Sequence, residues 1–348
     1  MSCPIRTFSP FLNYPAPAMP FDLAIHAPDL PRLNALLSSP DLRRSESPWM
    51  VKGPAYSRLY FGSEFCQHLL PSAEELQQAA ELAIAQGWSL TLLTSYSTDA
   101  FVEQTVDLVA TALAAIPDGL EVVVNDWGLL RRLGAEFGPE VTRVLGRGLN
   151  RMMRDPRVPD VGPEHLGGDA LPETWQQGSM HSRGFSALLE RLGVGRIESD
   201  VPLTGLAELP PSALATTLHA PWGMVASGRV CLVNAWGKPG ALRFVPPMHC
   251  DAPCRRFSIE LRAPWSRRDQ GAESLPLVAD GAFIPLTRLL NRRRNVLPEP
   301  ASDPAPRFFQ KGNTHFYRLS NDQLEALYSR AETSVHIDRL VVAPDLPM

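Results

Sequence analysis

The chain has 348 residues, 44% of them hydrophobic and 20% charged, which are the proportions of a globular protein with a sizeable core. Its formal net charge of −4 predicts no basic surface for nucleic acid, so we do not expect a nucleic-acid partner. No apolar run reaches the roughly 20 residues that cross a bilayer. The first residues also lack the apolar core of a signal peptide, so we expect a cytoplasmic protein without a transmembrane segment.

Short apolar runs alternate with longer amphipathic stretches along the chain. The runs that predict strands lie at 21–27, 57–63, 89–96, 120–127, 141–149, 195–203 and 214–220. Helices are predicted between them at 29–39, 72–87, 98–116, 128–137 and 185–193. Further along, 257–263, 314–319 and 335–343 resemble strands and 321–331 resembles a helix, whereas the Pro- and Gly-rich stretch 152–177 interrupts the alternation.

This alternation predicts an α/β protein with a (β/α)8, TIM-barrel-like fold, either closed or imperfectly closed and open at one edge. A doubly wound sheet fits less well, because no early strand is followed by the glycine fingerprint of a nucleotide-binding turn. We expect an N-terminal extension over residues 1–20 and a single barrel domain over 21–348 that carries the functional site.

Four cysteines are the strongest candidates for a functional site. Cys66 follows the second predicted strand, and Cys231, Cys250 and Cys254 follow the seventh with the spacing C-x18-C-x3-C. Thiols in a chain without an export signal indicate metal ligands sooner than disulfides. Because barrels build their sites from loops at the carboxyl ends of strands, residues this distant in sequence can meet at one site. Cys3, near the N-terminus, is expected to play no part.

Three interpretations of these cysteines remain open from spacing alone. A 4Fe–4S cluster accepts four thiolates from varied spacings. Structural zinc also takes four thiolates, although usually from two close pairs, and only one close pair is present here. The third interpretation is that the thiols are separately buried in the core.

Several polar residues fall at predicted strand ends and are candidate pocket residues, although each alone is more often structural. His249 could donate a hydrogen bond to the cysteine site or lie on the surface, and Arg229 could anchor an anion or form a salt bridge. No peptidase motif is present. The strand-end candidates are Asn125, Asp126, Trp127, Arg147, Asn150, Glu198 and Asp200.

The segments around the cysteines resemble a known family. LYFGSEFC at 59–66, HAPWGMVASGRVC at 219–231 and HCDAPC at 249–254 are similar to segments of the collagenase-like peptidase superfamily, in its UbiV/UbiU-like iron–sulfur branch. VVVNDWGLLRRL and VLGRGLNRMM also resemble family segments. The resemblance implies a barrel-like fold with a 4Fe–4S cluster bound by Cys66, Cys231, Cys250 and Cys254.

The resemblance also implies a function. Relatives support oxygen-independent hydroxylation, either of a small or lipid-like aromatic in anaerobic ubiquinone synthesis or of RNA bases, and UbiV-like proteins work with a sibling subunit. We therefore expect a hydroxylase component in a heterodimer with a related cluster-binding subunit. The alternatives are a non-catalytic binding or assembly subunit with a structural cluster or zinc, and an RNA-base hydroxylase, which the acidic charge disfavours.

Overall fold

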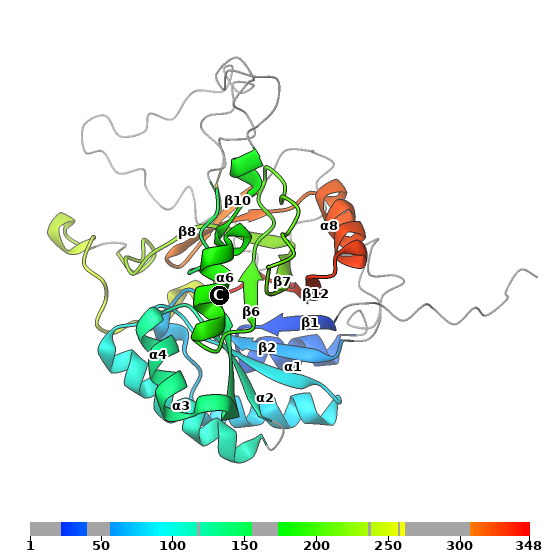
Figure 1. Cartoon of the computed structure of the whole chain (residues 1–348). Helices are drawn as coiled ribbons and strands as arrows, with labels where there is room; N and C mark the ends of the chain where they lie inside the picture. Colours follow the sequence, from blue (N-terminus) through cyan, green and yellow to red (C-terminus); the bar gives the residue numbers. More distant parts are fainter. Residues whose placement is uncertain are drawn as a thin grey trace, which may run out of the picture.

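The computed structural model describes residues 22–39, 56–116, 119–154, 173–235, 238–256, 258–261 and 307–348 (Figure 1). The predicted N-terminal extension 1–20, most of the interrupting stretch 152–177, and Cys3 lie outside the described residues.

Eight parallel strands form a closed barrel in the order β1-β12-β7-β6-β5-β4-β3-β2, which confirms the predicted (β/α)8 fold in its closed form. Every strand pairs in parallel with both neighbours, and β1 closes the barrel between β2 and β12. The barrel strands are β1 (Asp22–Ala27), β2 (Arg58–Gly62), β3 (Ser89–Leu93), β4 (Leu120–Val124), β5 (Val141–Leu145), β6 (Arg196–Ser199), β7 (Ala215–Ala220) and β12 (Ile337–Val342).

Helices connect the strands and cover the outside of the barrel (Figure 1). The predicted capping box is confirmed, because the Ser72 hydroxyl accepts from the backbone N–H of Glu75 at 3.1 Å and the Glu75 carboxylate accepts from that of Ser72 at 2.9 Å. None of the described helices is long and apolar enough to cross a membrane. The helices are α1 (Leu30–Ser38), α2 (Ala73–Ala85), α3 (Asp99–Ala115), α4 (Trp127–Glu136), α6 (Arg183–Arg191) and α8 (Asn321–Thr333).

A second, antiparallel sheet is inserted between the last two barrel strands, with the strand order β8-β11-β10-β9. Two of the predicted late strands therefore form, but in this sheet and outside the barrel. Its strands are β8 (Trp222–Ser227), β9 (Ile259–Leu261), β10 (Arg307–Lys311) and β11 (Thr314–Arg318). Short 3-10 turns are η2 (Gln67–Leu69), η3 (Gly138–Glu140), η5 (Glu173–Gln176), η6 (Ser179–His181), η7 (Gly240–Leu242) and η8 (Pro253–Arg255).

The second sheet packs over the carboxyl ends of the barrel strands. The ring of Phe316 on β11 meets that of Phe65, which follows β2, with centroids 5.5 Å apart. The Trp222 and Phe309 rings of the sheet itself meet edge to face at 5.2 Å. The end of the barrel where enzymes of this fold place their catalytic loops is thus filled by packed side chains. The apolar cluster consists of Phe65, Leu69, Trp222, Met224, Cys254, Phe309, Phe316, Ala343, Leu346 and Met348.

Candidate metal centre

The four predicted cysteines come from three segments of the chain. Cys66 precedes η2 after β2, Cys231 and Cys250 lie at the two ends of the loop that follows β8, and Cys254 lies in η8. All four are free thiols. Cys231 and Cys254 are buried, with 8% and 4% of their surface exposed, and Cys66 packs against the same apolar cluster as Cys254.

The structure brings these thiols close enough to influence one another. The pKa of Cys66 is raised to about 12, mainly by burial and to a smaller extent by the charges of Cys254, Cys231 and Cys250. Burial likewise raises the pKa of Cys254 to about 11, with added contributions from Cys231 and Cys250. Cys66 and Cys254 therefore stay protonated until a cation binds, since a bound metal deprotonates a coordinating thiol.

Asn234 joins two of the thiols directly. Its backbone N–H donates to Cys231 Sγ at 3.4 Å, and its side-chain Nδ2 donates to Cys250 Sγ at the same distance of 3.4 Å. Hydrogen bonds to sulfur stabilise the thiolate and are one of the levers that tune an iron–sulfur centre.

Asn313, in the turn between β10 and β11, holds two of the cysteine-bearing segments together. Its Nδ2 donates to the carbonyl of Phe65, next to Cys66, at 2.6 Å and to that of Gly228, at the end of β8, at 2.5 Å. A ring nitrogen of His68 lies 3.0 Å from the carbonyl oxygen of Pro247, so the segment that precedes Cys250 is also joined to η2. The site is therefore fixed by contacts among η2, the loop after β8 and the second sheet.

A buried ammonium group lies beside Cys254. Lys311, at the end of β10, is 5% exposed, and its Nζ donates to the carbonyl of Leu346 at 3.4 Å. Burial lowers the pKa of Lys311, while Asp345 and the thiolate form of Cys254 raise it. The adjoining Gly312 is packed so closely that an added Cβ would lie 3.4 Å from the Cβ of Cys254. Because buried charges in proteins are compensated, this lysine fits an anionic group at the thiols.

The thiols are not drawn together around one point. In the part of the chain that the structure describes, no group of three or more His, Cys, Asp or Glu side chains is placed to hold a single metal ion. A tetrahedral zinc site would bring its sulfur atoms to about 3.8 Å from one another.

Arg147, a predicted pocket residue, is the centre of a buried ionic network instead. Its Nε donates to Glu64 at 2.8 Å, its Nη1 donates to Asp200 at 2.9 Å, and Arg154 donates to the other oxygen of Asp200 at 3.1 Å. Burial favours the neutral form of Asp200, but Arg147 and Arg154 outweigh it and lower the pKa of Asp200. The guanidinium also lies 5.0 Å from the ring centroid of Phe65. Arg147 thus links the carboxylates of Glu64 and Asp200 beneath the second sheet.

Glu198, another predicted pocket residue, forms a second buried network that the sequence interpretation missed. Tyr60 donates to Glu198 Oε1 at 2.9 Å, and His219 Nε2 lies 2.5 Å from Glu198 Oε2. Burial raises the pKa of Glu198 to about 7 and lowers that of His219 to about 3, so a protonated carboxyl beside a neutral imidazole accounts for the contact. His219 is the last residue but one of β7. A polar residue near the carboxyl end of a predicted strand is the signal that could have revealed it.

Most of the remaining polar candidates have structural partners. Asn125 donates to the carbonyl of Thr94 at 2.8 Å and accepts from the backbone of Gly148 at 2.7 Å, so it clamps two barrel loops. Arg229 donates to the carbonyl of Ser97 at 2.8 Å, and His249 is exposed. The last four candidates are Asp126, which caps α4; Trp127, the first residue of α4; Asn150, which donates to the carbonyl of Glu198; and Asp200, which is described above.

Fold and site together define a closed (β/α)8-barrel protein whose carboxyl end is covered by a second sheet, with four thiols beside that cover. A scan against protein-family models and a search of curated proteins both find no match for the chain. The resemblance to the collagenase-like peptidase superfamily therefore stays a prediction.

Proposed function

We propose that the chain is a 4Fe–4S protein whose cluster is bound by Cys66, Cys231, Cys250 and Cys254. The main support is a donor set made only of thiols, on segments joined to one another, with a buried ammonium beside it. Thiolates are the ligands of such clusters, and a cluster with four thiolates carries negative charge that Lys311 compensates.

We propose a cluster in preference to zinc. Each thiolate of a 4Fe–4S cluster binds a different iron, so the four sulfur atoms stay farther apart than around a single ion. The described thiols influence one another's pKa without converging on one point, which is compatible with this wider arrangement. Zinc, which needs closer sulfurs, is the alternative.

The role that we propose is support of oxygen-independent hydroxylation of a small or lipid-like aromatic, together with a sibling cluster-binding subunit. Hydroxylation of a carbon with water as the oxygen source releases two electrons and two protons, so acceptors for two electrons are required, and a one-electron carrier can pass them on singly. Transfer of single electrons is the chemistry that a bound cluster supplies. The covered carboxyl end of the barrel supports a shared substrate site, because the usual position for a catalytic pocket is occupied by side chains such as Phe65 and Phe316.

Purification without oxygen tests the cluster. The protein should be brown, with about four irons per chain. Replacing Cys66 by Ala should abolish iron binding, whereas Cys3→Ala, the matched control, should keep it. A colourless protein that contains zinc, or loss of iron in the Cys3 variant, would overturn the assignment.

A second candidate function is a non-catalytic binding or assembly subunit with a structural cluster or zinc. The same covered barrel end favours it, since packed apolar side chains occupy the usual position of a catalytic pocket. Reduction and reoxidation of the purified protein separates the two roles. A cluster that cycles with its iron retained supports electron transfer, and one that is lost on reduction supports the structural role.

A further inference from the structure

Large apolar side chains are concentrated on the surface of the loop that joins two of the thiols. Of nine large apolar side chains that are exposed in the described residues, five lie between Cys231 and Cys250. No other described segment of similar length gathers as many. These side chains and their exposed fractions are Leu232 52%, Leu242 52%, Phe244 75%, Val245 53% and Met248 83%.

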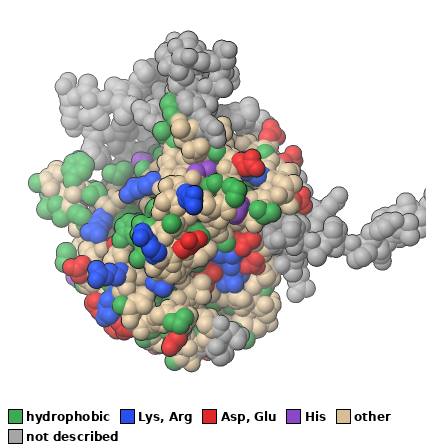
Figure 2. All heavy atoms as spheres, in the orientation of Figure 1, with side chains coloured by type: hydrophobic (Ala, Val, Ile, Leu, Met, Phe, Trp, Pro, Cys, Tyr) green, Lys and Arg blue, Asp and Glu red, His purple; other side chains and the backbone are tan. Residues whose placement is uncertain are grey.

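The loop stands away from the body of the protein. In Figure 1 the yellow segment leaves the barrel and projects to the left of the view, and Figure 2 shows apolar side chains gathered on that projection. Burial of apolar surface is favourable in any environment without water, and side chains on a projection can enter a fluid apolar layer without a partner of matching shape.

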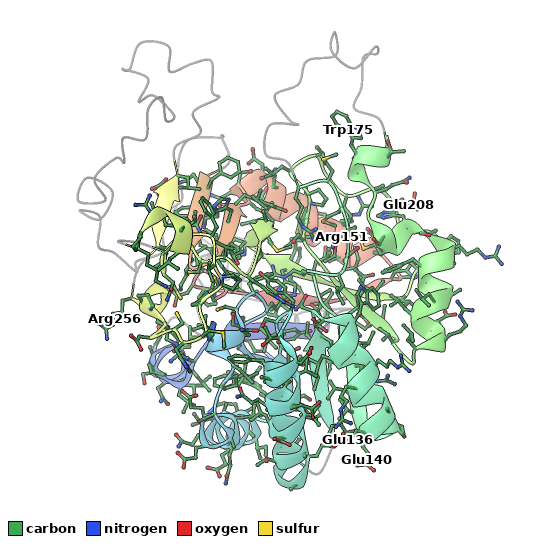
Figure 3. All side chains as sticks on the ribbon, turned by 90° about the vertical axis from the view of Figure 1, so that its left-hand side faces the viewer. Glu136, Glu140, Arg151, Trp175, Glu208 and Arg256 are labelled. Carbon is green, nitrogen blue, oxygen red and sulfur yellow. The ribbon has the colours of Figure 1, made fainter. Side chains whose placement is uncertain are left out.

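Basic residues accompany the apolar ones. Residues 231–256 contain Lys238, Arg243, Arg255 and Arg256 against a single acid, Asp251, although the whole chain carries a net charge of −4. Arg256 extends outward at the edge of the protein in Figure 3. A cationic projection on an acidic protein is attracted to an anionic surface, while the rest of the molecule is repelled from it.

We propose that the apolar loop, which comprises residues 231–235 and 238–256, docks onto an anionic lipid surface. Apolar side chains mixed with lysine and arginine are the pattern of segments that bind at the membrane interface, where buried apolar area and attraction to anionic lipids act together. Docking by this loop brings Cys231 and Cys250, which flank its exposed apolar side chains, toward the membrane surface. The inference goes beyond the proposed function and does not depend on the cluster.

Sedimentation with vesicles tests the proposal on the full chain as purified. The protein should bind vesicles of phosphatidylcholine with phosphatidylglycerol and not those of phosphatidylcholine alone, and added salt should weaken the binding. The double variant Phe244→Ser/Met248→Ser should bind at least tenfold more weakly. The matched control Ile84→Ser/Val335→Ser removes two apolar side chains that are 59% and 89% exposed elsewhere, and it should bind like the native chain.

A separate variant tests the electrostatic part. Arg243→Gln/Arg256→Gln should reduce the preference for anionic vesicles, while iron content, measured on every variant, stays unchanged. The proposal is overturned if the native chain binds neither kind of vesicle or if the Phe244/Met248 variant binds as well as the control. It is also overturned if light scattering shows a dimer that this variant converts to a monomer without any vesicle binding, since the loop would then contact a second copy of the chain.

Discussion

Arg147 offers the most direct test of how the second sheet is held on the barrel. Its guanidinium is fully buried, as are its partners Glu64, at 1% exposure, and Asp200, at 0%. It also donates to the carbonyl of Trp222 at 3.3 Å, the first residue of the sheet. Replacement by Met keeps much of the volume and removes the charge, which leaves two carboxylates in the interior without their shared cation.

The expected loss of unfolding free energy follows from this burial. Removing one partner of a buried ion pair costs about 3–5 kcal/mol. Asp200 would still pair with Arg154, whose Nε lies 3.1 Å away. We therefore expect Arg147→Met to lower the free energy of unfolding by about 3 kcal/mol, the lower end of this range. Urea unfolding followed by tryptophan fluorescence measures it. Arg132→Met is the matched control, because Arg132 also pairs with two glutamates but on an exposed surface, and it should leave the free energy of unfolding unchanged.

The effect of pH provides an independent check. In the native chain the pKa of Asp200 lies below its ordinary value of 3.8, so its contribution to stability is present above that pH and is lost as pH falls through the lower, folded value. In Arg147→Met, burial dominates and raises the folded pKa, so the variant gains stability as pH falls. The difference in unfolding free energy between the native chain and the variant should therefore become smaller as the pH falls from about 7 to about 5. A loss below about 1 kcal/mol, or a gap that is constant with pH, would refute the reasoning.

Three further predictions concern other buried groups. Burial raises the pKa of Glu198 to about 7 from its ordinary 4.5, so between these pH values the folded chain keeps a proton that the unfolded chain releases. The contribution of this group to stability therefore falls as the pH rises from 4.5 to about 7. Glu198→Gln should remove this part of the pH dependence of the unfolding free energy, measured by urea titration. Phe316→Ala should cost about 3–5 kcal/mol in urea unfolding because Phe316 is 0% exposed against Phe65, whereas Phe244→Ala, 75% exposed, should cost almost nothing. Lys311→Met should lower the reduction potential of a bound cluster, measured by anaerobic titration, because loss of a nearby cation disfavours the more negative reduced state. An unchanged potential with full iron content would show that Lys311 does not act on the cluster.

The barrel could be predicted because its signals are local. The segments around Leu59, Leu90 and Val122 are short buried runs, and each is followed by a helix with its own start signal, such as the Ser72–Glu75 capping box. Each βα unit can therefore be identified without knowing its neighbours, and the number of units then predicts a closed barrel. The four cysteines could also be grouped in advance, because strand ends on one side of a barrel lie together.

The second sheet could not be predicted, because antiparallel pairing depends on partners distant in sequence. Alternation in 314–319 predicts a strand but does not say that it pairs with β8 and β10 instead of a barrel strand. One local signal was present: Gly312 and Asn313 form a tight turn between two short apolar runs, with Gly312 at φ +56°. Recognising that hairpin would have placed Lys311 and Asn313 near a common turn, although not beside Cys254 and Phe65.

The position of the thiols would couple binding of the proposed cluster to the docking of the second sheet. Three of the four cysteines lie in the insertion between β7 and β12, and only Cys66 belongs to the first half of the barrel. A group that binds all four thiols therefore links the insertion to the barrel across the contact between Phe65 and Phe316. Ligand binding stabilises the state that holds the complete site. The proposed iron should therefore stabilise the docked sheet more than the barrel strands, because the barrel strands are hydrogen-bonded into a closed barrel without it.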